Sequence, residues 1–120
     1  GVDIDPKAVD VAYENAALNG IGRDRYTVRA GDVISDSALA AELARERYQM
    51  VLANIVADAI RMLAAPLTRH LAKGGLLICS GIIREREQDV LDAALAAGYV
   101  VADRLEKGEW VALALRNEAA

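Results

Sequence analysis

The fold class is most readily inferred from residues 48–54, Tyr48-Gln49-Met50-Val51-Leu52-Ala53-Asn54. The apolar run over 50–53 lacks the polar alternation of a strand with one wet face. We therefore expect a strand buried on both faces, as in a parallel sheet. A second apolar run, Leu76 to Ser80, follows a helical pattern over 56–71 that Pro66 interrupts, giving two short helices or one kinked helix. Two buried strands joined by helix indicate an α/β fold.

Towards the N-terminus, strand and helix patterns continue to alternate. The expected elements are extended segments at 1–5 and 26–30 and helices at 6–18 and 37–47. Asp5 is the expected N-cap of the first helix, with Pro6 at its first position, and Asn19-Gly20 ends it. Because the chain starts at Gly1 with a strand already ending, we expect a fragment whose beginning lies upstream.

Towards the C-terminus the pattern changes. The Lys-Gly-Gly sequence at 73–75 is expected to end the helical segment. The remaining expected elements are a strand at 76–80, a helix at 84–97 and a β-hairpin of strands 99–105 and 110–115. This order predicts a mainly parallel sheet with one antiparallel strand at the finish. We expect one domain over 1–116, followed by a frayed tail at 117–120.

Composition excludes several classes of protein. The 120 residues are 54% hydrophobic and 27% charged, which rules out a disordered chain or a collagen-like fibre. A net charge of −4 argues against a broad nucleic-acid-binding surface and favours a basic protein partner. The single cysteine, Cys79, suits a reducing cytoplasm, and no apolar stretch is long enough to span a membrane. Without a Cys or His cluster, no metal site is expected.

Three polar residues stand at predicted carboxyl ends of strands, where open parallel sheets bind ligands: Asp3, Asp32 and Asn54. Asp3 is placed to accept the hydroxyls of a ribose, although a plain polar loop residue would look the same. Asp32 could accept from a base amine or simply stabilise a turn, and the turn is favoured by position alone. Asn54 could orient an amine or cap the following helix, with equal support. For His70, a surface position near a helix end is favoured over a catalytic role.

Two segments near the N-terminus, GVDIDP (1–6) and ENAALNG (14–20), form a recognisable pattern. They resemble class I S-adenosylmethionine-dependent methyltransferases, which have a Rossmann-like sheet. Three later segments are more specific: ANIVAD (53–58), GGLLICSGI (74–82) and GEWVAL (108–113). With them, the chain resembles the ribosomal protein L11 methyltransferases. The match extends over essentially the whole chain.

The resemblance implies methyl transfer from S-adenosyl-L-methionine to lysine and N-terminal amines of a basic ribosomal large-subunit protein. By position, Asp3 would bind the ribose, Asp32 would lie near the adenine, and Asn54 would hold the methionine end or the incoming amine. Residues 54–57 (Asn-Ile-Val-Ala) replace the Asn-Pro-Pro-Tyr-like motif of other amino-group methyltransferases. Such chemistry depends on positioning and desolvating an uncharged amine more than on a strong base.

The family's first strand, its glycine-rich loop and its substrate-recognition domain would precede Gly1. Because that strand is central in the family sheet, its absence is expected to split the sheet and leave strand edges unpaired. The sequence leaves three rival functions open: another class I methyltransferase acting on RNA or small molecules, a dinucleotide-binding oxidoreductase fragment, and a non-catalytic truncated domain. It does not define the oligomeric state.

Overall fold

The computed structural model describes residues 1–119 and divides the chain into two compact units, Gly1–Leu43 and Ala44–Ala120. The described strands form two sheets, one in each unit. This agrees with the split sheet expected from the family resemblance. The expected tail residue Ala120 lies outside the described residues.

The first unit is a small α/β unit around a two-stranded parallel sheet. Its elements are β1 (Val2–Asp3), α1 (Pro6–Leu18), β2 (Arg29–Ala30) and α2 (Ser37–Leu43). Asp5 caps α1 as predicted, since its carboxylate accepts from the backbone N–H of Lys7 at 2.9 Å. Both strands and α2 are shorter than expected. Local hydrogen bonding of Asp3 and Asp32 turns the chain just after the strands.

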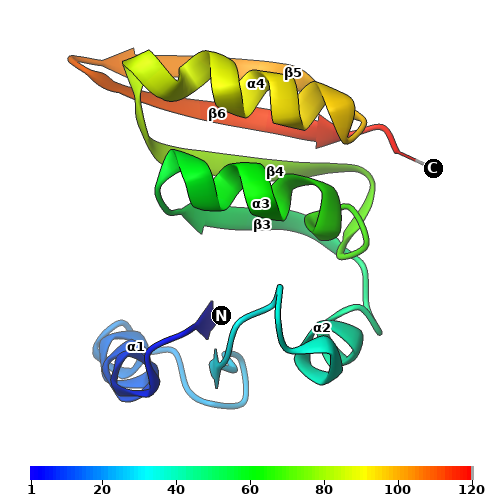
Figure 1. Ribbon diagram of the computed structural model, residues 1–120. Coiled ribbons are helices and arrows are strands. Elements are labelled where there is room, and N and C mark those ends of the chain that lie inside the picture. The colour runs from blue at the N-terminus through cyan, green and yellow to red at the C-terminus, as the bar shows by residue number, and fades with distance from the viewer. Residues whose placement is uncertain (120) are drawn as a thin grey trace. The chain divides into compact units, whose positions relative to one another are not determined.

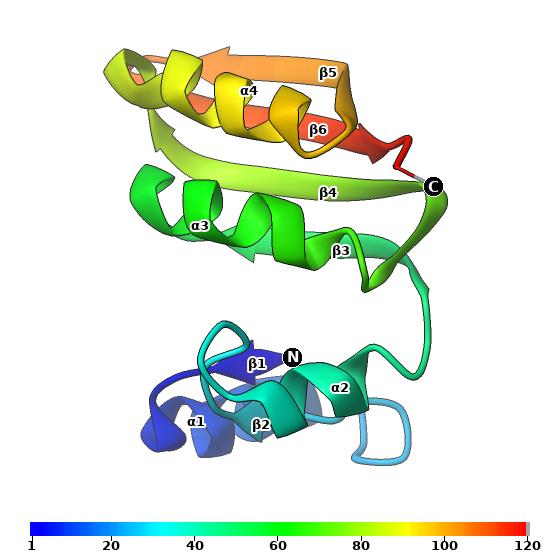
Figure 2. The same ribbon diagram turned by 45° about the vertical axis from the view of Figure 1, so that its right-hand side comes forward.

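The second unit is a four-stranded sheet in the order β3-β4-β6-β5, with helices α3 and α4 on one face (Figures 1 and 2). Its elements are β3 (Tyr48–Asn54), α3 (Ala57–Leu67), β4 (Leu71–Ile83), the short 3-10 helix η1 (Arg84–Arg86), α4 (Glu87–Ala96), β5 (Tyr99–Lys107) and β6 (Trp110–Asn117). The strands β3 and β4 are parallel, and β6 runs antiparallel to both β4 and β5. The predicted hairpin and its single antiparallel strand are therefore confirmed.

The core of this unit lies between the sheet and the two helices. It includes Leu77, Cys79 and Ile82 from β4, Ile60 from α3 and Val90 from α4, all nearly inaccessible to solvent. These residues come from three of the predicted elements, so the hydrophobic pattern identified the buried face correctly.

Strand β3 departs from the expectation of burial on both faces. Ala53 and Val51 pack on the core, whereas Met50 and Leu52, on the alternate positions, are 53% and 73% exposed. The helices cover only one face, so the apolar run has one buried side. Among the described strands, only β4 hydrogen-bonds to β3, which is therefore the edge strand of this sheet.

Glycines and the proline also behave differently from expectation. Lys73-Gly74-Gly75 does not separate helix from strand, because it lies inside β4 where the register with β3 shifts. Gly74 there takes a left-handed conformation with φ of 80°. Pro66 does not divide the helix in two: α3 is one helix, and Pro66 lies in its last turn, one residue before its end at Leu67. A proline in the last turn removes little helical hydrogen bonding.

Two polar residues predicted at the surface are buried. His70 lies just before β4 and Asn117 ends β6, and both are almost fully inaccessible. The Asn117 amide nitrogen donates to the carbonyl oxygens of Leu71 at 3.3 Å and Thr68 at 3.4 Å. The predicted frayed tail is therefore wrong for Asn117, which completes the end of the sheet.

Candidate functional site

Asp3 and Asp32 follow neighbouring parallel strands at the same end of the first unit's sheet. Asp3 ends β1 and pairs with Ala30, the last residue of β2, and Asp32 comes two residues after Ala30. Both carboxylates are exposed. The structure thus brings the two predicted acids to one sheet end, as parallel pairing requires.

Each of these carboxylates uses one oxygen to turn the backbone. The Oδ1 atom of Asp3 accepts from the N–H of Asp5 at 2.9 Å, and the Oδ1 atom of Asp32 accepts from the N–H of Ile34 at 2.9 Å. No hydrogen bond from another residue in the described part of the chain reaches the second oxygen of either acid. The turn role considered for Asp32 is confirmed, and a second acceptor atom stays available for a ligand.

Asn54 ends β3 in the second unit and lies opposite Ser80 of β4. It does not cap the following helix: Val56 occupies the N-cap position of α3, with no side-chain capping bond. Asn54 is exposed, and within residues 1–119 its side chain forms no hydrogen bond with the protein. The capping alternative is therefore excluded, and the amide is available to a ligand.

Gly81 provides the surface against which the Asn54 amide lies. A methyl group at Gly81 would meet the Asn54 oxygen at 2.9 Å, closer than real contacts allow, and Gly81 also has a φ of 77°. Only glycine combines this conformation with this close approach. Gly81 thus gives the Asn54 side chain room to lie against the backbone of β4, with its amide exposed to a polar ligand group.

The end of β4 beyond Gly81 carries apolar surface. Ile83 pairs with Trp110 across the β4–β6 ladder, and Trp110 is 52% exposed. Ile83 lies three residues after Ser80, the partner of Asn54. The second unit therefore presents a free amide and an exposed aromatic ring at the same end of its sheet.

The sequence profile of the family described as ribosomal protein L11 methyltransferase (PrmA) matches residues 1–118. The chain belongs to this family. A ribosomal protein L11 methyltransferase of Pelotomaculum thermopropionicum is 44% identical over 118 residues, which are 98% of this chain and 36% of that protein. The one from Geobacter metallireducens is 40% identical over 113 residues, covering 94% of this chain and 34% of the relative. The chain spans about a third of the length of these curated relatives.

Solved structures agree with the family assignment. A ribosomal protein L11 methylase from Lactobacillus delbrueckii subsp. bulgaricus superposes with a TM-score of 0.83 at 26% identity, covering 97% of this chain and 56% of that one. The fibrillarin pre-rRNA processing protein of Methanococcus jannaschii superposes with a TM-score of 0.77 at 15% identity. The superposition covers 99% of this chain and 55% of the fibrillarin chain. The α/β fold is thus the Rossmann-like fold of class I methyltransferases.

The described residues offer neither a cluster of metal ligands nor a membrane-spanning helix. No group of three or more His, Cys, Asp or Glu residues between 1 and 119 could hold a metal ion. In the same part of the chain, no helix has the length and apolar character needed to cross a membrane.

Cys79 is fully buried, and desolvation raises the pKa of its thiol to about 12. That thiol is neutral and shielded at physiological pH.

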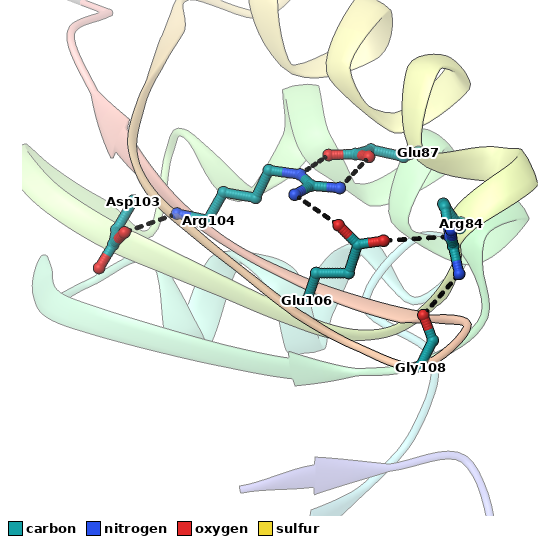
Figure 3. A network of polar contacts seen from close by, with 6 residues as sticks. All are labelled: Arg84, Glu87, Asp103, Arg104, Glu106 and Gly108. Atoms are coloured by element: carbon teal, nitrogen blue, oxygen red, sulfur yellow. Dashed lines mark hydrogen bonds and ion pairs between the residues drawn. The ribbon is translucent and has the colours of Figure 1, made fainter.

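Sequence reasoning missed two features of this site. Gly81 was visible only as part of an apolar run, because nothing in a linear sequence shows which side chain lies against a glycine. It also missed a chain of ion pairs that joins Arg84, Glu87, Arg104 and Glu106 (Figure 3). The charges were visible, but their pairing across some twenty residues depends on the hairpin register.

Proposed function

We propose that this chain provides part of an enzyme that transfers methyl groups from S-adenosyl-L-methionine to amines of a ribosomal large-subunit protein. Lysine side chains and the N-terminal amine are the proposed acceptors. The observation that carries the proposal is membership of the L11 methyltransferase family, together with a free Asn54 amide resting on Gly81. Residues 1–116 are proposed to belong to one catalytic domain, acting in the cytoplasm.

The two acids of the first unit are proposed to hold the nucleoside part of the cofactor. Asp3 would accept hydrogen bonds from the ribose hydroxyls, and Asp32 would accept from the adenine amine. Their chemistry supports these roles, because each acid keeps one carboxylate oxygen for a ligand while the other fixes its position. A ligand hydroxyl that donates to a carboxylate forms a charge-assisted bond, which is about twice as strong as a neutral one.

Asn54 is proposed to act on the incoming amine or on the methionine end of the cofactor. The bound cofactor would supply a methyl group on a sulfonium ion, which an uncharged amine can accept. The Asn54 amide oxygen can accept an N–H of that amine and so fix the direction of its lone pair. Because an amide does not ionise, Asn54 orients the amine without serving as a base.

A titration of the purified chain with S-adenosylhomocysteine, the demethylated product, tests the cofactor roles. We expect binding that weakens about 10- to 100-fold in Asp3→Ala, the effect of losing hydrogen bonds to a charged group. Asp10→Ala is the matched control, since Asp10 is an exposed carboxylate on α1 away from the sheet end, and its affinity should equal that of the wild type. Equal affinities for Asp3→Ala and the wild type would refute the ribose role.

The acceptor role needs a separate assay. With isolated ribosomal protein L11 as substrate, Asn54→Ala should lower kcat while leaving the affinity for S-adenosylhomocysteine within about threefold. An RNA transcript serves as the alternative acceptor. Methylation of the RNA and not of the protein would replace the proposed substrate with a nucleic acid.

A further inference from the structure

Four charged side chains from three elements form a continuous chain of contacts beside the turn of the β5–β6 hairpin (Figure 3). Arg84 of η1 contacts Glu106 of β5 at 3.1 Å, and Glu106 contacts Arg104 of the same strand at 3.0 Å. Arg104 then binds both carboxylate oxygens of Glu87 in α4, one of them at 2.8 Å. The chain thus links the start of α4 to the outer strand of the sheet.

Arg84 also holds the turn of the hairpin directly. Its guanidinium donates to the carbonyl oxygen of Gly108 at 2.6 Å, and its backbone N–H donates to that of Glu109 at 2.8 Å. Gly108 has a φ of 60°, so the turn depends on a left-handed residue. The hairpin tip, which we define as Gly108–Trp110, is therefore fixed to η1 by two hydrogen bonds from one residue.

The tip lies at the end of the sheet that carries the Asn54 amide. Trp110 pairs with Ile83, and Arg84 follows Ile83 directly. Asn54 pairs with Ser80 on the same strand. Trp110 and Asn54 therefore lie at the same end of the sheet, on the two strands that pair with β4, so the position of the tip affects what can approach that end.

We propose that Arg84 and Glu106 are positioning residues that hold the hairpin tip beside the carboxyl end of β4 and so shape the substrate side of the methyltransferase site. The functional part of this inference rests on the proposed function. The structural part, that Arg84 and Glu106 fix the position of the tip, rests only on the contacts described above.

Isolated surface ion pairs contribute little to stability, so an ordinary pair would not fix a hairpin. This chain of contacts differs in two respects. The Glu87 side chain is only 15% exposed and binds Arg104 through both oxygens, which gives that link a defined geometry. Glu106 is shared by two arginines, so the links depend on one another.

Fluorescence of Trp110, the only tryptophan, measures the position of the tip without any ligand. In Arg84→Met we expect a red-shifted emission maximum and stronger quenching by acrylamide, with the circular dichroism spectrum unchanged. Arg84→Lys keeps the cation and should recover part of the shift. Arg61→Met is the matched control, because Arg61 contacts Asp58 at 3.6 Å on α3 and has no contact with the hairpin. Wild-type emission in Arg84→Met would overturn the proposal.

A double-mutant cycle tests whether Arg84 and Glu106 are coupled in holding the hairpin tip. Arg84→Met, Glu106→Gln and the double variant are compared by the same emission shift. We expect the shift of the double variant to be smaller than the sum of the two single shifts, since Arg84→Met already breaks the Arg84–Glu106 link and Glu106→Gln then removes only the link to Arg104. Additive shifts would show that the two residues act separately and would overturn the shared role.

Kinetics of methyl transfer test the functional part. Arg84→Met should raise KM for the ribosomal protein about tenfold, with kcat within about twofold and unchanged affinity for S-adenosylhomocysteine. Unchanged KM would refute the effect on the substrate side. If the wild-type chain bound no S-adenosylhomocysteine, the proposed function would fail by itself, and the fluorescence series would still decide whether the ion pairs hold the tip.

Discussion

At the scale of single residues, Asn54 and Gly81 form the most specific contact of the candidate site. We expect Gly81→Ala to cost about 1–2 kcal/mol in stability, since alanine disfavours positive φ, and to displace the Asn54 amide as well. Gly74→Ala is a matched control: Gly74 has a φ of 80° but open space around it. Similar losses of stability on urea unfolding, with a loss of methyl transfer only in Gly81→Ala, are the expected result. Equal activities of both variants would contradict this role for Gly81.

Cys79 gives a second expectation at this scale. Burial raises the pKa of its thiol to about 12, so the thiolate is scarce at pH 8. The folded chain should not react with Ellman's reagent at that pH, whereas the chain in guanidinium chloride should react fully. Rapid labelling of the native chain, at the rate of a free thiol, would show that the core around β4 opens readily.

Residue-scale prediction from sequence worked where the interaction is local. The capping role of Asp5 and the left-handed Gly20 after α1 depend on neighbours within a few positions, and both are confirmed. Asn54 could not be assigned, because its cap and ligand roles differ only by where the following helix begins. The burial of His70 and Asn117 was missed because it results from packing between segments that are far apart in the sequence.

At the scale of elements, the C-terminal end of α3 depends on Asn117. The carbonyl oxygens of Thr68, just after the helix, and of Leu71 need hydrogen-bond donors. The side chains of Arg47 and Asn117 both donate to them. We expect Asn117→Ala to lower the free energy of unfolding by about 1–3 kcal/mol, since a buried partner is lost. Glu118→Ala, one exposed residue further, should change it by less than about 0.5 kcal/mol. Urea unfolding followed by Trp110 fluorescence measures both, and an equal effect would refute the capping role.

The link between α4 and β5 should respond to acid. The hydrogen bond from Arg104 holds the pKa of Glu87 below its ordinary value of 4.5. A carboxylate with a lowered pKa stabilises the fold above its unfolded pKa, and this contribution is lost as the pH falls through the folded pKa. Below about pH 4, we therefore expect the urea midpoint of the wild type to approach that of Glu87→Gln. A constant difference between the two down to pH 3 would contradict this.

At the scale of the whole molecule, the two units differ in how much they bury. The second unit has a continuous core, whereas the buried apolar residues of the first are few: Ala16, Val28, Leu39 and Ala40. We expect amides in residues 1–43 to exchange with deuterium sooner than those of β4 and β6. Mass spectrometry of peptides after timed exchange would show this, and equal protection in both units would contradict it.

The sequence predicted part of the topology. Element order and the C-terminal hairpin followed from hydrophobic runs and turn residues, so the mixed sheet could be anticipated. The bulge at Lys73-Gly75 could not be, because a glycine pair looks the same at a helix end and at a register shift. Nor could the sequence show that the run over 50–53 has one open face, since that depends on which helices cover the sheet.

The open edge of β3 has a consequence for the solubility of the chain. Its seven residues contain no charge and no proline, which are the features that commonly keep sheet edges from pairing with other molecules. The net charge of −4 is spread over the whole chain and gives this edge no protection of its own. We therefore expect chains to associate through β3 first, and Gln49→Lys, a charge at an exposed position of this strand, to raise the concentration at which the protein stays dispersed.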